Sequence, residues 1–144
     1  MQKQIAEYIT LTKPRIIMLV LVTAYLGYYL GLRSQDNHMN SIDSWIILLY
    51  LLIGTWATSA CAAVLNQVIE VSQDSEMIRT KNRPLVKGII SIFQATVFGI
   101  LLGACGFFFL FILINEITAW LSLLTILLYI FIYTPSKRIT TWNT

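Results

Sequence analysis

Hydrophobic residues gather into four long runs, and polar residues are concentrated in the segments between them. The runs cover residues 14–32, 44–65, 92–114 and 117–133. Each is long enough to cross a bilayer as a helix, which takes roughly 17–25 residues. None shows the alternation typical of a membrane β-strand. Because a backbone in lipid must satisfy its own hydrogen bonds, the pattern predicts an all-α integral membrane protein with four transmembrane helices.

Polar and proline residues mark where these helices begin and end. Pro14 suits the first turn of the first span. Ser91 and Gln94 have the spacing of a capping box, which predicts the start of the third span. Asn115 is placed to cap the fourth. Pro135 predicts the end of that span, because proline lacks the N–H that a continuing helix needs.

Composition and charge agree with a membrane protein and give it an orientation. The chain has 57% hydrophobic and 12% charged residues and a mean hydropathy of +0.72, whereas soluble domains carry about 25% charged residues. Arg33 is the one Lys or Arg expected on the far side; nine lie at 3, 13, 15, 79, 81, 83, 87, 137 and 138. The positive-inside rule then puts both termini and the segment 66–91 in the cytoplasm. We expect a bacterial inner-membrane protein, because the N-terminus resembles neither a signal nor a transit peptide.

Three polar side chains follow the second span at helical spacing. Residues 57–83 contain no Gly or Pro, so this span can continue as a helix beyond the membrane. Asn66, Glu70 and Asp74 then share one face, since residues four apart lie on the same side of a helix. Extending this spacing backwards adds Ala63, Ser59 and Thr55. A polar or small stripe within a span predicts a cavity rather than lipid on that side.

A basic segment, RTKNRP, follows this acidic face and contains Arg79, Lys81 and Arg83. Carboxylates beside cations suit a diphosphate bound with Mg²⁺, because Mg²⁺ takes one or two carboxylates together with phosphate oxygens. Arg and Lys would neutralise the remaining phosphate charge. The alternative left open by these residues is a surface ion pair of Glu70 or Asp74 with Arg79 or Lys81, which would contribute little stability.

Three stretches together resemble a known family. They are LTKPRI at 11–16, LNQVIE with Asp74 and MIRTKNRPL within 65–85, and YTPSKRITTWN at 133–143. The pattern is similar to the intramembrane prenyltransferase superfamily typified by 4-hydroxybenzoate polyprenyltransferase. Within that superfamily the Thr-Lys-Pro-Arg opening and the Asn-Gln-x-x-Glu segment look most like the protohaem IX farnesyltransferase (haem O synthase) branch.

The resemblance implies a fold, an activity and roles for particular residues. The fold is a bundle of roughly nine helices around a cavity open to the membrane, and the reaction joins the farnesyl group of farnesyl diphosphate to a vinyl group of haem B with Mg²⁺. Carried over by motif, Asn66, Glu70 and Asp74 would hold the Mg²⁺–diphosphate. The diphosphate would also bind Arg79, Lys81 and Arg83. Tyr133 and Lys137 are further candidates for lining the site, with ordinary anchoring at the membrane interface as the alternative.

The chain departs from the family in one respect. Members are about twice as long and carry a second acidic motif, which nothing after Asp74 supplies, so residues 1–144 are expected to be a single incomplete domain. We expect this N-terminal half to be inactive alone and to need the missing C-terminal half. Two other functions stay open: a prenyltransferase acting on an aromatic or quinone precursor, and a non-catalytic four-span protein that binds anionic lipid. No nucleic-acid partner is expected.

Overall fold

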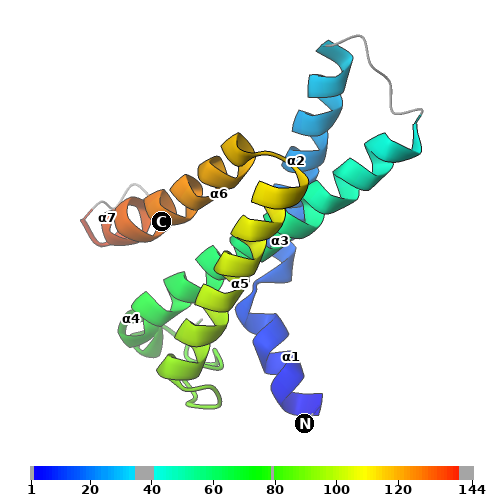
Figure 1. The fold of residues 1–144 in the computed structure, drawn as a ribbon. Coiled ribbons are helices and arrows are strands. Elements are labelled where there is room, and N and C mark those ends of the chain that lie inside the picture. The colour runs from blue at the N-terminus through cyan, green and yellow to red at the C-terminus, as the bar shows by residue number, and fades with distance from the viewer. Residues whose placement is uncertain (1, 35–40, 79, 140–144) are drawn as a thin grey trace.

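The computed structural model describes residues 2–34, 41–78 and 80–139, and its side chains for 4–34, 41–78 and 80–136. Every regular element in these ranges is a helix (Figure 1). The elements are α1 (Gln2–Leu11), α2 (Pro14–Ser34), α3 (Ile42–Ile69), α4 (Val71–Glu76), α5 (Ile92–Leu113), α6 (Glu116–Leu128), the π-helical turn η1 (Tyr129–Tyr133) and α7 (Thr134–Ile139). Within the described residues, four stretches are long and apolar enough to span a membrane: Pro14–Ser34, Ile42–Ile69, Ile92–Leu113 and Glu116–Ser136. The predicted all-α membrane fold with four spans is confirmed.

The predicted helix starts are confirmed at the level of hydrogen bonds. Helix α2 begins at Pro14. The Ser91 hydroxyl accepts from the Gln94 N–H at 3.1 Å, and the Gln94 side chain accepts from the Ser91 N–H at 3.0 Å, which completes the capping box of α5. Asn115 Oδ1 accepts from the Thr118 N–H at 2.8 Å and caps α6. These bonds satisfy amides that have no partner inside their own helix.

The predicted end of the fourth span at Pro135 is wrong. The helix passes through η1, where the Thr134 N–H bonds to the Tyr129 carbonyl five residues earlier, and continues as α7. The wider turn closes one helical segment and starts another at Thr134. Pro135 therefore falls in a first turn, where its missing N–H is not needed.

Helices α3 and α5 pack closely along each other and form the centre of the bundle (Figure 1). A Cβ on Gly106 of α5 would lie 2.9 Å from the Thr58 backbone nitrogen of α3, and one on Gly54 would lie 2.5 Å from the Leu110 side chain. Small residues at these points let the two backbones approach, as is usual between helices in lipid.

Helix α1 is held against α3 and α5 by two side-chain contacts. The Tyr8 ring meets the Phe98 ring of α5 edge to face, with centroids 5.0 Å apart. The buried Gln67 side chain donates to the Leu11 carbonyl at 2.6 Å, across 56 residues of sequence. Gln67 thus joins the end of α3 to the corner between α1 and α2.

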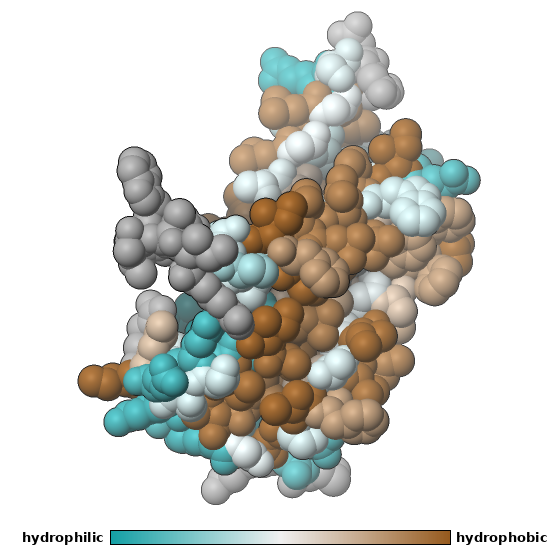
Figure 2. Space-filling view, turned by 90° about the vertical axis from the view of Figure 1, so that its left-hand side faces the viewer, coloured by the Kyte–Doolittle hydropathy of each residue, from teal (hydrophilic) through white to brown (hydrophobic). Residues whose placement is uncertain are grey.

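The outer surface has the polarity expected in a membrane. Figure 2 shows mainly hydrophobic side chains across the middle of the molecule and hydrophilic ones towards its upper and lower ends. Leu19, Ile112 and Ile117 are 70% or more exposed. Side chains of this kind avoid water but tolerate lipid, so the chain is a multi-pass membrane protein.

Candidate functional site at the end of helix α3

Asn66 lies in the last turn of α3 and is fully buried. Its Nδ2 donates to Glu70 Oε2 at 2.7 Å, and its Oδ1 accepts from the Thr134 hydroxyl at 2.9 Å. Thr134 opens α7, 68 residues further along the chain. Both ends of the amide are therefore engaged, one by its own segment and one by the fourth span.

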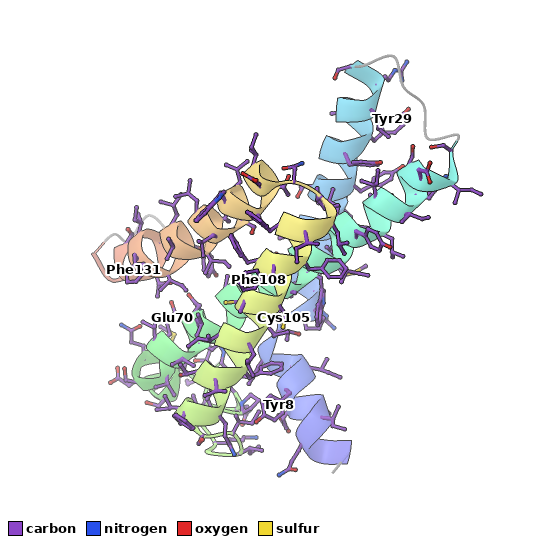
Figure 3. All side chains as sticks on the ribbon, viewed as in Figure 1. Tyr8, Tyr29, Glu70, Cys105, Phe108 and Phe131 are labelled. Carbon is purple, nitrogen blue, oxygen red and sulfur yellow. The ribbon has the colours of Figure 1, made fainter. Side chains whose placement is uncertain are left out.

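Glu70 occupies a break between two helices, so the expectation of an unbroken helix through Asp74 is wrong at this residue. Helix α3 ends at Ile69, Glu70 has φ −89° and ψ 3°, and α4 begins at Val71. Glu70 is labelled in Figure 3. The Glu70 N–H still bonds to the Asn66 carbonyl at 3.0 Å, and the Asp74 N–H bonds to the Glu70 carbonyl at 2.8 Å. The four-residue hydrogen-bond spacing thus continues through Asn66, Glu70 and Asp74.

Asp74 forms an ion pair with Arg83. The Asp74 side chain is 8% exposed and that of Arg83 is 24% exposed. The Thr80 hydroxyl donates to the Asp74 carbonyl at 2.8 Å, which fixes the turn between the two charges. The opposite charges do pair, as the alternative in the sequence allowed, but Asp74 pairs with Arg83 rather than Lys81, and in a largely buried position.

The chain directly after the basic segment packs back onto the helices. Leu85 and Ile90 are buried in one hydrophobic cluster with Leu11, Val64 and Ala95. This packing holds the segment next to α4, so the backbone places Arg83 near Asp74. Lys81 is exposed, and Arg79 lies outside the described residues.

The polar stripe on α3 faces a cavity, as its spacing predicted. A cavity of about 270 Å³ lies between α2, α3 and the fourth span, and Thr55, Ser59 and Ala63 line it. The described residues that complete its wall are Lys13, Ile16, Ile17, Val20, Thr58, Ala62, Ser122, Thr125, Ile126 and Tyr129. Most of this surface is apolar, and its polar lining residues are Lys13, Tyr129 and the hydroxyl-bearing residues of α3 and α6.

Tyr129 connects the cavity to the charged residues. It lines the cavity, and its carbonyl lies 2.9 Å from the Thr134 hydroxyl, which also bonds to Asn66, the partner of Glu70. Its ring stacks on Tyr133, with centroids 5.0 Å apart, and Tyr133 is 41% exposed. The candidate Tyr133 thus lies beside the site, while the Lys137 side chain lies outside the described residues.

Two residues of this site escaped the sequence reasoning: Tyr129 and Thr134. Thr134 lies within the YTPSKR stretch that carries the family resemblance, so a signal was present, but its partner Asn66 was not visible from sequence spacing. Tyr129 lies four residues before Tyr133, at the start of the π-helical turn.

The oxygen donors of this site suit Mg²⁺ only in company with a ligand. Among the described residues no three His, Cys, Asp or Glu side chains lie together in a metal-binding group. Mg²⁺ prefers oxygen, keeps several waters and commonly binds through one or two carboxylates plus phosphate oxygens. Glu70 and Asp74 match that requirement, and Arg83 supplies a cation that can bind phosphate in two-point fashion.

Comparison with known proteins gives consistent matches along the chain. The model of the UbiA prenyltransferase family matches residues 20–144. "Protoheme IX farnesyltransferase" of Solibacter usitatus is 38% identical over 140 residues, covering 96% of this chain and 48% of the relative. "Protoheme IX farnesyltransferase, mitochondrial" of Gibberella zeae is 37% identical over 148 residues, covering 100% of this chain and 29% of the relative. "Protoheme IX farnesyltransferase 2" of Pseudoalteromonas atlantica is 39% identical over 138 residues, covering 95% and 43%.

These relatives are considerably longer than the chain. It spans less than half the length of each of the three. No solved structure gives a significant match.

Proposed function

The chain belongs to the UbiA prenyltransferase family, and from that premise we propose that it takes part in haem O synthesis. The proposed reaction is Mg²⁺-dependent transfer of a farnesyl group from farnesyl diphosphate to a vinyl group of haem B. The observation that carries the proposal is a mainly apolar cavity lined by Ala63 of α3, with a cluster of acidic and basic side chains that starts one helical turn further along the chain, at the Asn66–Glu70 hydrogen bond and the Asp74–Arg83 ion pair. An isoprenoid diphosphate has the same division, an apolar chain joined to an anionic head.

Different residues are proposed to bind the metal ion and the diphosphate. We propose that Glu70 and Asp74, with Asn66 beside them, hold Mg²⁺ and the diphosphate. When bound, the metal would neutralise charge on the diphosphate oxygens. Arg79, Lys81 and Arg83 would bind the rest of the leaving group, and to do so Arg83 would exchange Asp74 for phosphate.

The chemistry needs a stabilised leaving group, and the allylic fragment must be kept from water until it has added to haem B. The bond between C1 of the farnesyl group and the diphosphate oxygen breaks, and its electron pair leaves with the diphosphate. Cations that are already in place stabilise the negative charge that develops on the leaving diphosphate. Electrostatic stabilisation of this kind is usually the largest contribution to catalysis. The allylic cation adds to the vinyl group of haem B, and water, losing a proton, then supplies the hydroxyl of the product. Tyr133 and Lys137 are proposed to line the site beside these groups.

The setting of the protein is also proposed from the distribution of charge. With basic residues at both ends and in the segment 66–91, the positive-inside rule favours an orientation with both termini in the cytoplasm, and we propose that the membrane is a bacterial inner membrane. This places the acidic and basic residues at the cytoplasmic surface, where soluble farnesyl diphosphate could reach them.

The test is farnesyl transfer by the purified product of the complete reading frame, with haem B and farnesyl diphosphate. We expect farnesylated haem with Mg²⁺, measured by chromatography and mass spectrometry, and none with EDTA. Glu70→Gln is expected to lower kcat/KM at least 100-fold. Glu116→Gln, an acid in the first turn of α6, should leave the rate unchanged. The 144-residue chain alone is expected to give no product.

Other outcomes would favour the alternatives. Farnesylation of 4-hydroxybenzoate in place of haem B would indicate an aromatic-acceptor prenyltransferase. Binding of farnesyl diphosphate that ignores Mg²⁺ and survives both Glu70→Ala and Asp74→Ala would indicate a non-catalytic protein that binds anions such as lipid headgroups.

A further inference from the structure

The buried contact between Thr134 and Asn66 joins the fourth span to the acidic segment. Thr134 is 1% exposed and Asn66 is fully buried. Their 2.9 Å hydrogen bond lies between the last turn of α3 and the residue at which α7 begins. The contact joins segments that are 68 residues apart in the sequence, and it affects the groups that lie beside Asn66.

The hydroxyl and the amide form a chain of hydrogen bonds with one direction. Thr134 Oγ1 lies 2.9 Å from the Tyr129 carbonyl as well as 2.9 Å from Asn66 Oδ1. The hydroxyl has one proton for these two acceptors. The Tyr129 carbonyl also accepts from the Thr134 N–H, whereas the hydroxyl is the donor that satisfies the buried Asn66 Oδ1, so we assign the proton to Asn66. With Oδ1 accepting from Thr134, the amide must turn its Nδ2 towards Glu70 Oε2, where the distance is 2.7 Å.

The reverse orientation of the amide is unfavourable. Turning Asn66 over would bring its Oδ1 against a Glu70 carboxylate oxygen, so that two acceptors would face each other without a proton. The hydroxyl of Thr134 and the charge of Glu70 therefore favour the same orientation. Hydrogen bonds in such a chain polarise and strengthen one another in a buried setting.

We propose that Thr134 is a positioning residue for the diphosphate site: acting through Asn66, it fixes the direction of the Glu70 carboxylate. The inference rests on the proposed function and adds to it a residue of the fourth span. It also gives Asn66 an indirect role, because both polar ends of its amide are engaged within the protein. Groups that orient a metal-binding side chain typically change metal affinity 10- to 100-fold when removed.

Thr134 lies where the helix of the fourth span is irregular. The π-helical turn before it and Pro135 after it set where α7 begins. The hydrogen bonds from Thr134 to Asn66 and from Asn66 to Glu70 thus connect the fourth span to the helix break between α3 and α4. Among the described residues, no buried side-chain polar atom lacks a partner, and removing the hydroxyl would leave Asn66 Oδ1 as one.

The test uses the product of the complete reading frame and inorganic diphosphate as the probe, titrated calorimetrically with and without Mg²⁺. Thr134→Val keeps the shape but removes the hydroxyl, and we expect its Mg²⁺-dependent affinity to fall 10- to 100-fold. Thr134→Ser restores the donor and should bind within about threefold of wild type. Thr12→Val is the matched control: this threonine is also buried, and its hydroxyl bonds to Ile9 in its own segment. It should bind like wild type.

A double-mutant cycle separates positioning from loss of structure. In the Asn66→Ala background, Thr134→Val should cause no further loss of diphosphate affinity, because the path to Glu70 is already cut. Thermal unfolding of all variants shows whether each one is folded. Thr134→Val should melt below Thr12→Val, because it leaves the buried Asn66 Oδ1 without a donor, whereas the Ile9 carbonyl still accepts from the Thr12 N–H.

Three results would overturn the inference. The first is wild-type diphosphate affinity in Thr134→Val. The second is an equal loss of affinity from Thr134→Val in the Asn66→Ala background and in wild type. The third is a Thr134→Ser variant that binds as weakly as Thr134→Val. If the wild-type protein binds diphosphate equally well without Mg²⁺, the proposed function fails and the inference fails with it. If wild type shows Mg²⁺-dependent binding and the cycle is additive, the inference alone fails.

Discussion

The Asp74 carboxylate is largely buried, and Arg83 supplies its counter-charge. A buried ion pair contributes modestly as a pair, because removing both charges from water is costly, but the loss of one partner leaves the other uncompensated. The structural role and the proposed diphosphate role of Arg83 therefore meet in one side chain.

Removing one partner of this pair should harm stability more than removing both charges. We expect Arg83→Ala to destabilise the protein by roughly 2–3 kcal/mol, since the Asp74 carboxylate keeps its burial and loses its counter-charge. The double variant Asp74→Asn with Arg83→Ala should lose less than the sum of the single losses. Thermal unfolding in detergent measures this, and strictly additive losses would show that the two side chains do not interact.

At the scale of elements, the contact between α3 and α5 depends on the absence of side chains at particular positions. Gly106 lies against the Thr58 backbone, whereas a Cβ on Gly27 of α2 would meet nothing within 4 Å. Both glycines lie inside transmembrane helices, so they differ in their surroundings more than in their local conformation.

This difference predicts opposite effects for the same substitution. Gly106→Ala should destabilise by about 1–3 kcal/mol, because the added methyl group forces α5 away from α3. Gly27→Ala should be neutral or stabilise by up to about 1 kcal/mol, since alanine is the better helix former. The measurement is thermal unfolding of both variants. Equal effects would mean that the close approach of α3 and α5 is not needed for stability.

For the molecule as a whole, the proposed orientation makes a prediction about access from each side of the membrane. With the native Cys61 and Cys105 replaced by alanine, Lys87→Cys should react with an impermeant maleimide only in inverted membrane vesicles. Asp43→Cys, at the opposite end of α3 from Glu70, should react only in right-side-out vesicles or intact spheroplasts. Both side chains are exposed. Reversed labelling would contradict the positive-inside assignment.

Much of the fold follows from local patterns, and these are the parts that were predicted. The four spans depend on length and hydrophobicity, and the capping bonds of Ser91 and Asn115 involve residues three apart. The spacing of Thr55, Ser59 and Ala63 correctly predicted a cavity, because a single helix determines which residues share its face. The UbiA family was also recognisable from short stretches of sequence.

What the sequence determined by itself is therefore the number of spans, their starting points and the presence of an acidic face beside basic residues. Only the tertiary structure decided the helix break at Glu70, the π-helical turn before Thr134, and the pairing of Asp74 with Arg83. Each of these depends on contacts between residues distant in sequence or on competition among backbone hydrogen bonds, which local spacing does not encode. Asn66 shows the division: its place on the helix could be read from the chain, but its orientation is set by a threonine 68 residues away.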